Sequence, residues 1–133
     1  MSDIQPVVRY MVVCEDVQTG PENPRRISLV GLISAIRSLE DPPFPLLYRE
    51  ICVYLLLTEC RGPAEGRIAI QHADSGEMVF RGPTRTLSFA NDPLEIVGAT
   101  FRVRNCLFKK AGLYWVQFWY NEQIIAHQPL ILR

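Results

Sequence analysis

Apolar and polar residues alternate most clearly in the range 112–132. Successive side chains of a strand point to opposite faces of a sheet. One predicted face carries Tyr114, Val116, Phe118 and Tyr120, and the other carries Trp115, Gln117 and Trp119. A second apolar run follows the pair Asn121-Glu122. The range 112–132 is therefore predicted to form a β-hairpin.

The turn of this hairpin fixes the predicted cross-strand pairs. Asn121 tolerates the positive φ of a two-residue turn, whereas Glu122 is poorer than glycine there, so the turn is strained or longer. A two-residue turn pairs Trp119 with Ile124 and places His127 opposite Val116 on the same face as Tyr114. Proline cannot donate to a ladder, so the second strand is expected to lie at an edge near Pro129.

The start of the hairpin indicates which face is buried. Gly112 precedes Tyr114 by two residues, and this spacing resembles the tyrosine corner of immunoglobulin-like sandwiches. In such a corner the phenol hydrogen-bonds back to the backbone of the preceding connection. The face with Tyr114 is then the inner one, and the two tryptophans point outward.

The rest of the chain also has the pattern of strands. Turn signals recur every eight to twelve residues, which is typical of a sandwich or barrel. The predicted strands upstream of the hairpin are 6–17, 26–37, 50–60, two in 66–80 joined by 74–76, 84–90 and 96–103. The sequence thus predicts an all-β fold, a single-domain immunoglobulin-like β-sandwich over residues 1–133 with about eight or nine mostly antiparallel strands.

Three local features refine this prediction. Gly31 in the middle of the second strand indicates a bulge or a close backbone approach. The proline-rich range 39–45 cannot pair regularly and is expected to cross between sheets. The range 50–60 is the most hydrophobic and is assigned to the centre of a sheet, in preference to a helix starting at Pro45.

The order of these motifs resembles a known family. The succession is ISLVGLISAI, PPFP, a strand ending in LTECRG, a D-S-G hairpin and finally AGLYWVQFWYNEQIIAHQPL. It is similar to a family of short, uncharacterised bacterial proteins described only as a domain of unknown function. The resemblance covers nearly the whole chain and implies one β-sandwich domain and a bacterial source. It implies no activity, so no functional residue is carried over.

Composition narrows the classes of partner. The 133 residues contain 14 basic and 14 acidic residues, so the formal net charge is zero. A neutral chain is not expected to bind nucleic acid or an acidic membrane. The sequence has no run of eighteen apolar residues, so no transmembrane helix is expected. The N-terminus does not resemble a signal peptide. A cytoplasmic protein is expected.

No motif for catalysis, a metal or a cofactor is found. Cys14, Cys52, Cys60 and Cys106 form no C-x-x-C pair and are expected to be buried, reduced thiols. His72 near Asp74 could offer two metal ligands, but a polar hairpin end is the simpler interpretation. His127 is interpreted as a hydrogen-bonded interior histidine. We therefore expect no enzyme activity and no cofactor, with a scattered Cys–His site as the least favoured alternative.

The outward tryptophans are the main functional clue. Trp115, Trp119 and Ile124 would form an apolar stripe of the size that marks an interaction surface, unless another segment covers it. The favoured hypothesis is a non-enzymatic interaction or assembly module whose partner is a second copy or another protein. The alternative is a small-ligand or carbohydrate-binding sandwich in which both indoles stack on the ligand. Arg102 and Arg104 are interpreted as part of a solvated face.

Overall fold

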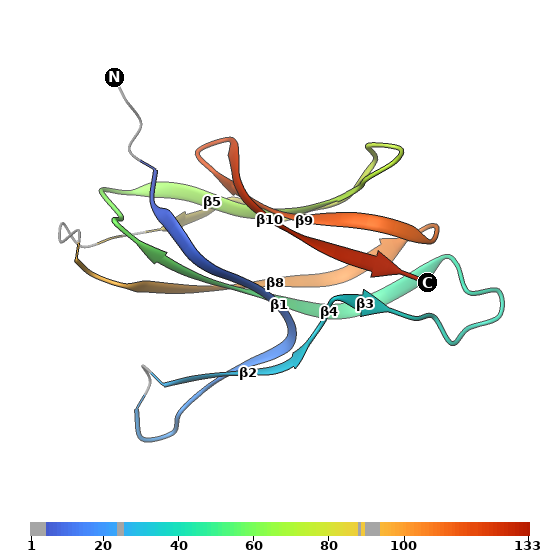
Figure 1. Cartoon of the computed structure of the whole chain (residues 1–133), viewed down its shortest axis with the longest axis horizontal. Helices are drawn as coiled ribbons and strands as arrows, with labels where there is room; N and C mark the ends of the chain where they lie inside the picture. Colours follow the sequence, from blue (N-terminus) through green and yellow to red (C-terminus); the bar gives the residue numbers. More distant parts are fainter. Residues whose placement is uncertain (1–4, 24–25, 88, 90–93) are drawn as a thin grey trace.

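The computed structural model describes residues 5–23, 26–87, 89 and 94–133. These residues form ten strands in two sheets and no helix, so the all-β prediction is confirmed with slightly more strands than expected. The sheets lie one above the other, with β5, β9 and β10 in one layer and β1, β4 and β8 in the other (Figure 1). None of the described residues belongs to a helix that could span a membrane.

The smaller sheet has four strands in the order β2-β1-β4-β8. All of its neighbouring strands are antiparallel. Their bounds are β1 Val7–Thr19, β2 Ile27–Leu32, β4 Leu46–Thr58 and β8 Val97–Phe108. The hydrophobic strand β4 lies between β1 and β8, which confirms its central position, although it begins four residues earlier than predicted.

The larger sheet has the order β3-β10-β9-β5-β6, and β7 also pairs with β5. Only the short pairing of β10 with β3 is parallel among the pairs described. The bounds are β3 Ala35–Ile36, β5 Ala64–His72, β6 Met78–Arg81, β7 Arg85–Leu87, β9 Gly112–Tyr120 and β10 Gln123–Leu132. Because β3 pairs only with Ile131 and Leu132, β10 is unpaired on that side at Pro129, as predicted.

The core lies between the two sheets and contains the side chains that the alternation assigned to it. Tyr114, Val116 and Phe118 are fully buried, and Tyr120 is 4% exposed. From the opposite sheet, β4 contributes Ile51, Val53, Leu55 and Leu57. Burial of side chains of this size supplies most of the driving force for folding, about 25 cal/mol per Å² of apolar surface.

The predicted strand 26–37 is wrong as a single element. The chain forms β2 in the smaller sheet, leaves it after Leu32, and forms the two-residue strand β3 in the larger sheet. Gly31 has φ +68°, and a β-carbon there would lie 2.7 Å from the side chain of Glu15. The close approach inferred at this glycine is thus confirmed, and the strand ends just beyond it.

Other upstream predictions are mostly confirmed. The proline-rich range 39–45 connects β3 in the larger sheet to β4 in the smaller one, so it does cross between sheets. The hairpin of β5 and β6 forms through residues 74–76. Strand β8 continues to Phe108 instead of ending at 103. The turn predicted at 91–93 lies outside the described residues.

The β9–β10 hairpin has the predicted turn but a shifted register. Asn121 and Glu122 have φ values of 45° and 67°, as a two-residue turn requires. Trp119 pairs with Ile124 as expected, but a bulge follows and Phe118 then pairs with Ala126.

The bulge moves His127 to the other face of the sheet. Ile125 is the extra residue, and its side chain packs against the core. After it the alternation is reversed, because one inserted residue exchanges the faces of all that follow. His127 therefore pairs with Gln117 on the outer face. Its prediction as an interior residue opposite Val116 is wrong.

Tyr114 anchors the connection that precedes β9. Its hydroxyl donates a 2.6 Å hydrogen bond to the carbonyl oxygen of Lys110, while the ring lies in the core. Burial raises the pKa of this phenol, so it stays protonated and able to donate. The backbone hydrogen bond inferred from Gly112 and Tyr114 is thus present.

We predict that Tyr114→Phe lowers the free energy of unfolding by about 1–2 kcal/mol, because the Lys110 carbonyl loses its donor inside the fold. Urea denaturation measures this. Tyr10→Phe is the matched control, since Tyr10 is 61% exposed and its change should stay within about 0.5 kcal/mol. Equal effects of the two substitutions would contradict the anchoring role.

Candidate functional site

The outer face of the larger sheet carries the residues that the sequence singled out. Trp115 and Trp119 are half-buried there, and Ile124 is 44% exposed. Strand pairing places Arg67 of β5 beside Trp119, and Arg81 of β6 one row away. We call this surface the tryptophan face and define it as Arg67, Gln71, Met78, Arg81, Trp115, Gln117, Trp119, Ile124 and His127.

Neighbouring side chains hold both indoles in place. The Arg67 guanidinium lies 4.6 Å from the centre of the Trp119 ring, a cation–π contact. Trp119 Nε1 donates to Gln117 Oε1 at 3.1 Å, and Gln117 Nε2 donates to Gln71 Oε1 at 2.9 Å. The His127 ring lies 4.5 Å from Trp115. The face is thus pre-ordered, and each indole has lost part of its ring surface to a neighbour.

The charged side chains on and beside the tryptophan face form no ion pair within the described residues. Arg67 and Arg81 form no ion pair with any of the described residues. Glu65 and Glu122, at the end of the face near the β9–β10 turn, are exposed and also form none within the described part of the chain. The surface therefore offers both signs of charge around an apolar centre.

A shallow hollow of about 380 Å³ lies on this face. It is lined by Arg67, Gln71, Met78, Arg81, Gln117, Trp119 and Ile124. Trp119 therefore borders a hollow, whereas Trp115 does not border this one and is instead covered by His127. The structure does not bring the two predicted stacking indoles to one ligand-sized hollow.

The histidines do not form a catalytic pair. His72 is 4% exposed, and its Nδ1 accepts from the Ser75 backbone N–H at 3.1 Å. Its Nε2 lies 3.4 Å from the Ala111 carbonyl, so the tautomer protonated at Nε2 satisfies both contacts. His72 thus closes the β5–β6 hairpin, while His127 lies on the outer face of the sheet. Within the described ranges, no group of three metal-ligating side chains occurs.

The four cysteines are buried and unpaired, as expected. Burial raises the pKa of every thiol, and that of Cys106 rises to about 12. Cys14 and Cys52 are cross-strand neighbours of β1 and β4, outside the main core. The shifts favour the protonated thiol, which is a poorer nucleophile than the thiolate.

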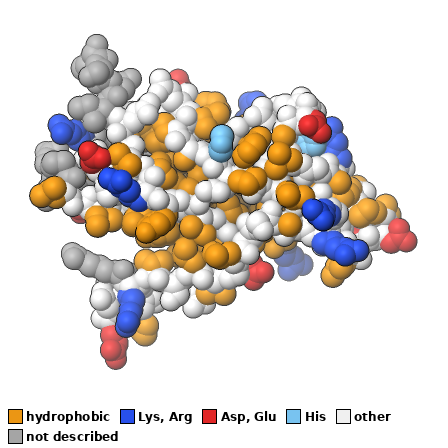
Figure 2. Space-filling view, in the orientation of Figure 1, with side chains coloured by type: hydrophobic (Ala, Val, Ile, Leu, Met, Phe, Trp, Pro, Cys, Tyr) orange, Lys and Arg blue, Asp and Glu red, His pale blue; other side chains and the backbone are white. Residues whose placement is uncertain are grey.

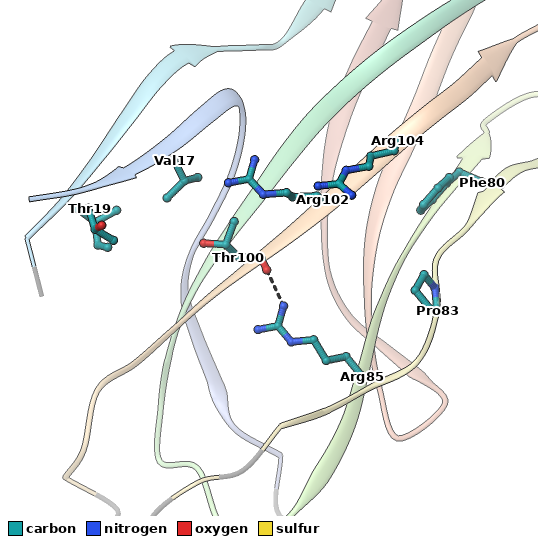
Figure 3. A pocket seen from close by; sticks show the side chains of 9 residues that line it. Val17, Thr19, Phe80, Pro83, Arg85, Thr100, Arg102 and Arg104 are labelled. Carbon is teal, nitrogen blue, oxygen red and sulfur yellow. Dashed lines mark hydrogen bonds between the residues drawn. The ribbon is translucent and has the colours of Figure 1, made fainter. Parts of the chain in front are cut away.

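Sequence reasoning missed a second surface, which is an arginine-lined hollow of about 760 Å³. Arg102 and Arg104 project from the outer face of β8, and Arg85 of β7 joins them although it is distant in sequence. Figure 3 shows all three guanidinium groups extending into the space between Val17 and Phe80. The interpretation of Arg102 and Arg104 as a simple solvated face is incomplete, because the alternation along β8 gave no sign of Arg85.

A third feature is apolar and lies where β1 passes β10. Hydrophobic side chains gather across the middle of this side of the molecule (Figure 2). Tyr10 and Leu32 are 61% and 71% exposed, and Pro129 borders a hollow between the two strands. Pro129 also pairs with Trp115 across the hairpin. The apolar surface therefore continues from the tryptophan face around this edge.

Comparison with known proteins assigns the family. A model described as a family of unknown function, DUF6941, matches residues 9–133. The chain belongs to this family. Among curated proteins, no sequence matches the chain. The family resemblance drawn from the motifs is thus supported as far as a domain of unknown function.

Two solved structures align with the chain at low sequence identity. One is the Pseudomonas fluorescens alkylpurine DNA glycosylase AlkC bound to DNA containing an abasic site analog, with a TM-score of 0.50 and 12% identity. Another is a beta-D-glucoside glucohydrolase from Trichoderma reesei, with a TM-score of 0.47 and 12% identity. Nearly all of this chain aligns, 99% and 97%, but it spans only 31% and 19% of those proteins. The likeness therefore concerns the fold alone.

The raised pKa of Cys106 predicts a loss of stability in alkali. The native state binds the thiol proton up to about pH 12, whereas the unfolded thiol releases it near 9.0. The contribution of the Cys106 thiol to the free energy of unfolding is fully present below pH 9. It falls as the pH rises toward 12, by up to about 1.4 kcal/mol per pH unit.

Chemical denaturation of wild type and Cys106→Ala between pH 8 and about 11 tests this. The free energy of unfolding of Cys106→Ala should fall less steeply with rising pH than that of the wild type. Val103→Ala is the control for lost packing, because it truncates a fully buried, non-titrating neighbour in β8. The assignment is wrong if Cys106→Ala and Val103→Ala have the same pH slope.

Proposed function

We propose that the protein is a non-enzymatic binding module that uses the tryptophan face as a protein interface. The observation that carries the proposal is that two ordered indoles lie on the outer face of a sheet beside charged side chains that form no ion pair with the described residues. Tryptophan and arginine are the residues most enriched among those that dominate binding energy at interfaces. The structural use of His72 and the protonated thiols support a binding role over catalysis.

The partner that fits this face best is a second copy of the chain. Symmetric dimers are the commonest assemblies, and their interfaces are self-complementary. The face carries Arg67 and Arg81, and Glu65 and Glu122 lie at its end, so two copies can pair opposite charges. Its apolar centre at Trp119 and Ile124 would lose contact with water in such a dimer.

We propose the fold type, the cellular compartment and the origin of the protein from further features of the chain. The Tyr114 hydrogen bond and the two packed sheets support an immunoglobulin-like sandwich. Four unpaired cysteines support a reducing compartment, and hence the cytoplasm. The family resemblance supports a bacterial origin.

Sedimentation equilibrium tests the dimer. We predict that the wild-type chain dimerises at micromolar concentrations and that Ile124→Lys weakens dimerisation about tenfold or more, since it buries a charge against apolar groups. Leu107→Lys is the matched control, because Leu107 is 40% exposed on the other sheet and Ile124 is 44% exposed. A wild-type monomer at about 100 μM, or equal effects of the two variants, would contradict the proposed interface.

The hollow beside Trp119 favours one second candidate, a module that binds a neutral oligosaccharide or similar small ligand. We predict for this case that a bound oligosaccharide changes the tryptophan fluorescence. Trp119→Ala should abolish the change and Trp115→Ala should retain it, because only Trp119 borders this hollow. Unchanged fluorescence of the wild type at millimolar oligosaccharide would eliminate this candidate.

A further inference from the structure

We propose that the arginine-lined hollow, at the edge of the sandwich where β8 lies beside β6 and β7, binds a phosphorylated small molecule with an apolar or planar part. Nucleotides are the simplest members of this class. The proposal rests on three guanidinium groups whose remaining donors form no hydrogen bond within the described part of the chain, on a positive local charge and on an apolar wall. It is independent of the dimer proposed above, since none of the residues that line this hollow belongs to the tryptophan face.

Arg102 is held by one hydrogen bond to a thiol and by two ion pairs. Its Nη1 donates to the Cys52 thiol at 3.1 Å, and thiol sulfur is a weak acceptor. The carboxylates of Asp16 and Glu50 each lie 3.7 Å from the same nitrogen, beyond hydrogen-bond distance. These contacts position the guanidinium at the hollow while its Nε and Nη2 donors form no hydrogen bond to the described residues.

Arg85 and Arg104 are also positioned, and each keeps donors that form no hydrogen bond to any residue the structure describes. Arg85 Nη1 donates to the Thr100 carbonyl at 2.6 Å (Figure 3). Its guanidinium also stacks 4.6 Å from the Phe101 ring centre. Arg104 uses Nε for Glu50 at 3.1 Å, which leaves its two terminal nitrogens. Each side chain is thus fixed through one group and presents others, as a planar guanidinium does when it binds phosphate in a fork.

The charge at the hollow favours an anion. Three guanidinium groups line the hollow, and two carboxylates, Asp16 and Glu50, lie beside Arg102 and Arg104. Among these groups of the described chain one positive charge is left over, in a protein with zero net charge. Every second residue of β8 points to the same face, and Thr100, Arg102 and Arg104 share one face in this way. Successive side chains on that face are about 7 Å apart. This spacing suits a ligand with more than one anionic group.

The apolar walls of the arginine-lined hollow favour a ligand that has an apolar or planar group. Val17 and Ile27 of the β1–β2 hairpin form one side, and Phe80 and Pro83 near β6 form the other. A volume of about 760 Å³ lies within the usual range of small-molecule sites. An apolar or planar group can contact these walls while the anionic group reaches the arginines, a combination that inorganic phosphate cannot use.

Isothermal titration with ADP, adenosine and pyrophosphate at low ionic strength tests the site. We expect ADP to bind, adenosine to bind at least about tenfold more weakly, and added salt to weaken ADP binding. Arg85→Gln and Arg102→Gln should each weaken ADP binding about tenfold or more, since each removes a charged donor. Arg67→Gln, on the tryptophan face, is the matched control and should leave ADP binding unchanged.

Arg104→Gln is a further variant that distinguishes loss of ADP binding from loss of folding. Its side chain is 69% exposed, so its replacement should weaken ADP binding without lowering the thermal unfolding midpoint. The proposal is overturned if ADP does not bind at millimolar concentration, if adenosine binds as well as ADP, or if Arg67→Gln has the same effect as Arg102→Gln. A single-stranded oligonucleotide that binds where ADP does not would also overturn it.

Discussion

Strand β9 divides its side chains between two environments, and both the core and the tryptophan face depend on that division. It lies between β10 and β5, which pair with it along most of its length. Tyr114 and Phe118 are fully buried on one side, whereas Trp115 and Trp119 are half-buried on the other. A shift of one residue would exchange these sets. Any sequence change that alters this register therefore affects stability and binding together.

The sequence predicted the features that depend on local signals. The faces of β9 followed from alternation, the central place of β4 from its continuous apolar run, and the crossing at 39–45 from its prolines. The bulge at Ile125 could not be predicted, because Ile124 and Ile125 are both apolar and either could have been the extra residue. That ambiguity is why His127 was assigned to the wrong face.

The missed parts of the candidate sites depend on long-range pairing. Trp115, Trp119 and Ile124 come from one hairpin, so their common face could be inferred. Arg67 reaches Trp119 only because β5 pairs with β9. Arg85 reaches β8 because β7 pairs with β5 of the other sheet and so lies at the edge of the sandwich. Nothing within a single segment indicates which strands become neighbours.

The arginines of the two surfaces differ in what their immediate neighbours leave available. Arg67 covers an indole, so its charge is partly used in ordering an apolar surface. Arg102 faces a thiol and two carboxylates beyond hydrogen-bond distance, so a ligand that supplies good acceptors would replace poor contacts. Ligand binding at Arg102 therefore requires little loss of existing hydrogen bonding.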